Sequence, residues 1–135
     1  STTTDVTIPY TQYRSLYENT AAHFGEISAR SLNGFGHSLI AGYPIPGRLH
    51  PGDNIGRLLC QVWTVRPDST GLALAAYMVA LNKECDRQEV ARPGFDAVVR
   101  GLPLAINENE FPDVDVATLI STVRREVPQY YSDLS

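Results

Sequence analysis

The first residue that could perform chemistry in this 135-residue sequence is a serine, in the segment Gly36-His37-Ser38-Leu39-Ile40. In α/β-hydrolases, the sequence Gly-x-Ser-x-Gly places a nucleophilic serine on a sharp turn between a strand and a helix. Here Ile40 stands where the second glycine would be, and neither a preceding strand nor a following helix is predicted. A turn in which Ser38 bonds to the local backbone fits the segment better, so we assign no catalytic residue.

The three histidines could bind a metal only if the fold brought them together. His23 lies in a helical pattern, whereas His37 and His50 lie in a long loop. No two of them have the i, i+4 spacing of a helical metal site, and neither cysteine is near them in the sequence. We therefore predict no metal and no cofactor, with a zinc site assembled from distant segments as the alternative.

An acidic run offers oxygen ligands at close spacing, as a calcium loop does. Its members are Glu108, Glu110, Asp113 and Asp115. The run lacks the central glycine and the twelve-residue register of an EF-hand. Because acidic side chains stabilise the first turn of a helix, we expect these residues to mark a helix start.

Arginine accounts for ten of the eleven basic residues, and Lys83 is the single lysine. Arginine binds carboxylates and phosphates with a planar fork and tolerates partial burial in interfaces. A GC-rich genome would also favour arginine codons, so the bias has two explanations. The candidate interface residues are Arg14, Arg30, Arg124 and Arg125, with Tyr130 and Tyr131 near the C-terminus.

A second arginine pair flanks a predicted helix start. Arg48 and Arg57 could contact an anion or an RNA phosphate, because the free N–H groups of a helix N-terminus bind anions. Asp53 lies between them and would repel phosphate, and the phosphate-binding glycine motifs are absent.

Periodic apolar residues predict the helices that must position these side chains. The expected helices cover 10–32, 54–65, 70–90, a short segment that opens at Gly94 and closes at Pro103, and 114–127, where Pro128 stops the last one. Strand alternation is hard to find; its best case is 58–66. The fold class is therefore all-α: residues 1–135 form a single domain, an irregular bundle of about five helices with long Pro/Gly-rich loops and extended terminal arms.

The predicted core centres on the third helix. Residues 72–81 are apolar nearly all round, whereas the polar segment 82–89 is expected to leave the core. Cys60 and Cys85 are too few for a disulfide framework, so we expect two free thiols, one of them in the core.

Three segments are expected to lie outside the helices. They are an N-terminal arm at 1–9, a loop at 33–53 and a C-terminal tail at 128–135. Irregular loops of about twenty residues are uncommon in a compact domain and usually carry function or contact a partner.

The composition excludes several classes of protein. The net charge of −4 argues against a strongly basic nucleic-acid module. The longest apolar run, 72–81, is too short to span a membrane. Residues 1–5 contain neither the charged nor the apolar part of a signal peptide, so we expect synthesis in the cytoplasm.

These observations favour a structural, self-assembling subunit that binds copies of itself, such as a virion coat or filament protein. Its arginine clusters could also meet nucleic acid. One alternative is a small adaptor or regulator that binds a single protein partner through a helical groove or the 33–53 loop. The other is a small enzyme with its site at that loop, using His37, His50 or the acidic run.

Overall fold

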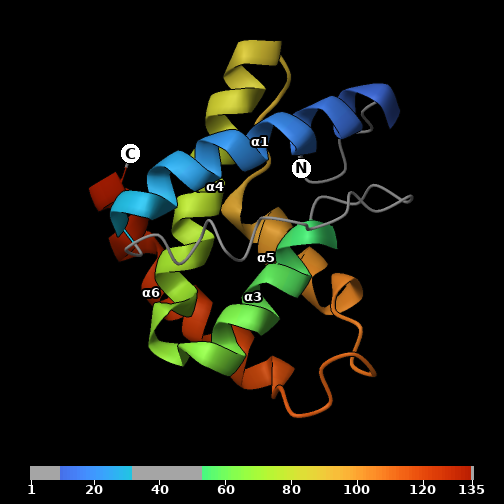
Figure 1. Cartoon of the computed structure of the whole chain (residues 1–135), viewed down its shortest axis with the longest axis vertical. Helices are drawn as coiled ribbons and strands as arrows, with labels where there is room; N and C mark the ends of the chain where they lie inside the picture. The colour runs from blue at the N-terminus through green and yellow to red at the C-terminus, as the bar shows by residue number, and fades with distance from the viewer. Residues whose placement is uncertain (1–9, 32–52, 135) are drawn as a thin grey trace.

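The computed structural model describes residues 10–31 and 53–134, and within them the protein is an all-α bundle (Figure 1). Its elements are α1 (Tyr10–Ser31), α3 (Asp53–Val65), the 3-10 turn η2 (Pro67–Ser69), α4 (Thr70–Gln88), α5 (Phe95–Ala105) and α6 (Val116–Leu134). No strand occurs in these two ranges. The expected helical bundle is thus confirmed, while the arm at 1–9 and nearly all of the 33–53 loop lie outside the described residues.

Helix α4 is the centre of the bundle, and α1, α3 and α6 all pack on it. In Figure 1 it runs down the middle of the molecule, with α1 crossing its upper half and α6 lying against its lower half. Every residue of α4 from Ala73 to Leu81 is buried. A helix that is apolar on all sides needs neighbours on all sides, and the predicted core position of 72–81 is confirmed.

The interface between α1 and α4 is formed by apolar side chains of α1. Leu16, Phe24 and Ile27 are buried there, and the ring of Phe24 is tilted against the ring of Tyr77 at a centroid distance of 5.9 Å. Aromatic pairs at this separation favour tilted over face-to-face geometry.

The prediction that the polar end of α4 leaves the core is wrong for three of its residues, while Lys83, Asp86, Arg87 and Glu89 are exposed as expected. Asn82, Glu84 and Cys85 are all buried. The reason is that α1 covers one side of this segment, where Asn19 bonds to Glu84, while Tyr131 of α6 bonds to Asn82 on another side. Polar residues can enter a core when their hydrogen bonds are satisfied there.

Two helices also continue past the prolines that were expected to end them. Pro103 lies inside α5, and the last turn is retained by a 3.0 Å bond from the N–H of Ile106 to the carbonyl of Leu102. Pro128 lies inside α6, which continues through most of the predicted tail to Leu134.

Packing beyond Pro128 explains why α6 does not stop there. A proline in a helix interior costs about 3 kcal/mol, because it removes an N–H and crowds the preceding turn. Tyr130, Tyr131 and Leu134 pack against the core, so continuing the helix buries apolar surface that an extended tail would leave in water.

The C-terminus of α4 has an unusual backbone conformation. Glu89 adopts φ 57°, ψ 41°, the left-handed region, while the N–H of Val90 bonds to the carbonyl of Cys85 at 3.0 Å. Helices often end with a residue in this left-handed conformation, and that residue is usually glycine. A side chain is strained in that region, and glycine is not.

Replacing Glu89 with glycine is expected to stabilise the protein by about 1 kcal/mol, because it removes the steric cost of the left-handed conformation. Urea denaturation followed by circular dichroism measures the change. Glu89→Ala is the matched control, because it removes the same carboxylate and keeps the Cβ. Equal stability of the two variants would show that the charge, and not the backbone, sets the effect.

No helix of the described residues is long and apolar enough to cross a membrane.

Candidate functional site

The first candidate site is a polar cluster around the buried side chain of Glu84, between α1 and α4. Arg87 donates to both carboxylate oxygens, with Nε at 3.0 Å from Oε1 and 2.9 Å from Oε2. Gln88 donates to Oε2 at 2.7 Å, and Asn19 of α1 donates to the same oxygen at 3.3 Å. Nε2 of His23 lies 3.3 Å from Oε1. Two residues of α1 thus converge on one carboxylate of α4.

The cluster holds Glu84 in its ionised form. The hydrogen bond from Arg87 is the largest cause that lowers its pKa to about 2; burial opposes this effect, and the bonds from Gln88 and Asn19 add to it. A carboxylate with this pKa accepts hydrogen bonds at neutral pH and has no proton to donate. The arrangement therefore fits a hydrogen-bond network that holds α1 against α4, and it does not fit general acid catalysis.

Both thiols are protonated and buried, which makes them poor nucleophiles. Burial, followed by the charge of Glu110, raises the pKa of Cys60 to about 11. Burial is also the first cause that raises the pKa of Cys85 to about 11. The expectation of free thiols is confirmed, and both of them lie in the core, not one.

The histidines and the acidic run form no metal centre in the part of the chain that the structure describes, where no group of three potential ligands occurs. His37 and His50 lie outside that part, and His23 belongs to the Glu84 cluster.

The predicted role of the acidic run at a helix start is confirmed for Asp115. Its Oδ1 accepts from the backbone N–H of Thr118 at 3.2 Å, and its Oδ2 accepts from the Thr118 hydroxyl at 2.8 Å. These bonds, the one from the hydroxyl first, lower the pKa of Asp115. Glu110 instead forms an ion pair with Arg57 at 2.9 Å.

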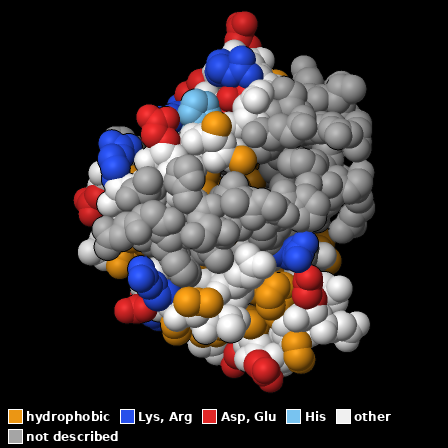
Figure 2. Space-filling model, in the orientation of Figure 1, with side chains coloured by type: hydrophobic (Ala, Val, Ile, Leu, Met, Phe, Trp, Pro, Cys, Tyr) orange, Lys and Arg blue, Asp and Glu red, His pale blue; other side chains and the backbone are white. Residues whose placement is uncertain are grey.

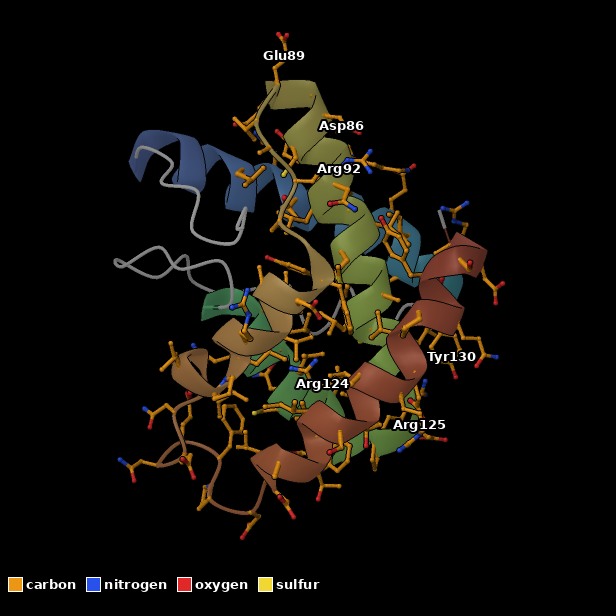
Figure 3. All side chains as sticks on the ribbon, turned by 180° about the vertical axis from the view of Figure 1, so that it is seen from behind. Asp86, Glu89, Arg92, Arg124, Arg125 and Tyr130 are labelled. Atoms are coloured by element: carbon orange, nitrogen blue, oxygen red, sulfur yellow. The ribbon has the colours of Figure 1, made fainter. Side chains whose placement is uncertain are left out.

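The arginines proposed for subunit contacts lie at different places. Arg30 is exposed in the last turn of α1, and the side chain of Arg14 is outside the described residues. Arg124 and Arg125 leave α6 in different directions, Arg124 toward α5 (Figure 3). The structure does not bring these residues into one cluster.

The two tyrosines proposed for subunit contacts and the two arginines proposed for anion binding also lie at different places. Tyr130 and Tyr131 are half-buried on α6. Arg57 has a carboxylate partner in Glu110, while Arg48 lies outside the described residues.

A second candidate site is a pocket of about 480 Å³ between α4, α6 and the segment that joins α4 to α5. Its lining residues are Met78, Asn82, Arg92, Pro93, Gly94, Phe95, Val127, Pro128 and Tyr131. The sequence analysis missed this pocket, because its walls come from three separate parts of the chain. The nearest signal is the segment 92–95, where arginine, proline, glycine and phenylalanine follow one another.

Comparisons with protein-family models, with curated proteins and with solved structures gave no match to this chain.

Proposed function

We propose that this protein is a structural subunit that assembles with copies of itself, as the subunits of a virion coat or a filament do. The supporting observation is a contrast among its arginines. Arg57, Arg87 and Arg92 each have a carboxylate within hydrogen-bond distance. Arg124 approaches Asp96 only to 3.9 Å and Arg125 approaches Glu126 only to 3.6 Å, and their side chains are 49% and 68% exposed.

The same chain carries a surface that is complementary to these two arginines. The loop between α5 and α6, residues 106–115, contains four carboxylates and no basic residue. Arg57 binds one of them, Glu110, while Glu108 and Asp113 are exposed. Two exposed arginines on α6 and an acidic loop elsewhere on the same subunit favour head-to-tail contacts, which build rings or filaments.

The distribution of charged side chains on another face of the molecule is also compatible with contacts between copies. On the described part of the face in Figure 2, basic and acidic side chains are interspersed, so contacts made there do not oppose two surfaces of one sign.

The double substitution Arg124→Ala with Arg125→Ala is expected to weaken assembly by at least tenfold in dissociation constant, or about 1.4 kcal/mol, and to leave the helical content unchanged. Sedimentation velocity over a concentration series measures the association, and electron micrographs show the form of the particle. Assembly should also weaken between low and high salt, because the screening length falls to about 3 Å at 1 M.

The control is Lys83→Ala, which removes an exposed positive charge from α4 and should leave assembly as it is. Reversing the charge of the loop with Glu108→Arg and Asp113→Arg should weaken assembly. Combining these two substitutions with Arg124→Glu and Arg125→Glu should restore assembly. A wild-type chain that remains a 14.8 kDa monomer at high concentration would overturn the proposal and favour the adaptor alternative.

A further inference from the structure

We infer that the pocket between α4, α6 and residues 92–95 binds a small amphipathic carboxylate, with its apolar body inside the pocket and its carboxylate at Arg92. This inference does not rest on the proposed self-assembly. The volume of about 480 Å³ is that of a small-molecule site, since such pockets measure roughly 300–1,000 Å³.

The walls of the pocket match an apolar ligand body. Met78 and Val127, both nearly fully buried, contribute aliphatic surface, and Phe95 contributes an aromatic ring. Pro93 and Pro128 restrict the backbone on either side, which favours a preformed site. Transferring apolar ligand atoms onto these walls supplies about 25 cal/mol for each Å² removed from water.

Empty space at Gly94 is an independent observation on the same site. Gly94 lines the pocket with an ordinary φ of −77°, and a Cβ built on it would meet no atom within 4 Å. A larger side chain can therefore be placed at this edge of the pocket without a clash at its Cβ, which gives a way to obstruct the pocket.

One unused hydrogen-bond donor lies among the residues that line the pocket, on Tyr131 of α6. Asn82 donates to the hydroxyl oxygen of Tyr131 at 2.5 Å, so the hydroxyl proton of Tyr131 remains to be donated. In the described structure this proton has no acceptor. A hydroxyl donor at the edge of an apolar pocket suits a ligand oxygen, and an anionic oxygen gives the stronger bond.

Arg92 supplies the charge for a ligand carboxylate. It lines the pocket and forms an exposed ion pair with Asp86, in which Nε lies 2.9 Å from Oδ1 and a terminal nitrogen contacts Oδ2. Figure 3 shows the two side chains pointing toward each other beside α4. A guanidinium has five N–H donors and Asp86 uses two of them, so Arg92 can bind a second carboxylate while it keeps the first. An exposed pair of this kind is worth at most about 1 kcal/mol, so it also rearranges at low cost.

The test compares octanoate with octanol, which share an apolar chain and differ in charge, by titration calorimetry on the full chain. Octanoate is expected to bind more tightly than octanol. Arg92→Met should weaken octanoate binding about tenfold, the factor for one hydrogen bond to a charged group, and should leave octanol binding unchanged. Asp86→Asn should strengthen octanoate binding, because it removes a negative charge that lies beside Arg92 and repels the ligand carboxylate. Arg100→Met, on the exposed surface of α5, is the matched control and should change neither.

Gly94→Leu tests the location of the site, because it obstructs the pocket at an edge where a side chain has room. It should abolish the binding of both probes, while thermal melts and circular dichroism show that the variant stays folded. Equal binding of octanoate and octanol, survival of octanoate binding in Gly94→Leu, or no saturable binding of octanoate up to about 1 mM would overturn the inference.

Discussion

Replacing Glu84 with alanine lowers the free energy of unfolding by about 3 kcal/mol in our expectation, the scale for removing one partner of a buried ion pair. The substitution removes the acceptor of bonds from Arg87, Gln88 and Asn19 and leaves a cavity between α1 and α4. Arg87 is more than half exposed and can turn to water, which keeps the loss from being larger. Urea denaturation at neutral pH measures the change.

The charge of Glu84 is tested separately by the isosteric change Glu84→Gln. Because folding lowers the pKa of Glu84 from 4.5 to about 2, its contribution to stability is complete above pH 4.5 and disappears as the pH falls through about 2. Between these values, the wild type should lose stability more steeply than Glu84→Gln. Glu108→Ala, which removes an exposed carboxylate, is the control and should change stability by less than about 0.5 kcal/mol. Parallel acid profiles of wild type and Glu84→Gln would contradict the assigned role of the carboxylate.

Gly71→Ala is expected to destabilise the protein by about 2 kcal/mol, although alanine is the better helix former. A Cβ at Gly71 would lie 2.7 Å from the Cβ of Glu126 and 2.8 Å from its Oε1. The first contact is the decisive one, because a Cβ cannot move without its backbone, so α4 and α6 must separate. Overpacking of this kind typically costs about 1–3 kcal/mol.

Gly94→Ala is the matched control for this substitution. It adds the same methyl group at a glycine where nothing lies within 4 Å, and it should change stability by less than about 1 kcal/mol. Thermal and urea denaturation of the two variants under one set of conditions gives the comparison. A Gly71→Ala protein as stable as the wild type would show that α6 does not approach α4 this closely.

The sequence predicted the helices well, because apolar spacing is a local signal. The buried run at 72–81 and the cap at Asp115 follow from residues that are neighbours in the chain. The helix end at Pro128 was mispredicted because tertiary packing of Tyr130 and Tyr131 offsets a local cost. The end at Pro103 was mispredicted because the N–H of Ile106 still bonds to the carbonyl of Leu102.

The candidate sites depend on partners that are distant in the sequence. Glu84 is buried because Asn19, 65 residues away, reaches its carboxylate, and no periodicity in 82–89 carries that information. The pocket combines Met78 of α4, Phe95 of α5 and Val127 of α6, so it exists only once the helices have packed.

Because α4 lies at the centre, the helices are expected to detach from the bundle in a particular order. Among the described helices, α1 packs chiefly on α4, whereas α3 packs on α4 and α5, and α6 packs on α4 and α5. Helix α1 can therefore detach as a separate cooperative unit, a foldon, while the rest of the bundle stays together. Such a partly open state exposes the groove that Phe24 and Ile27 occupy, and the α1 of another copy could fill it. In an assembly of the proposed kind, exchange of this helix between subunits would be one way to link neighbouring copies.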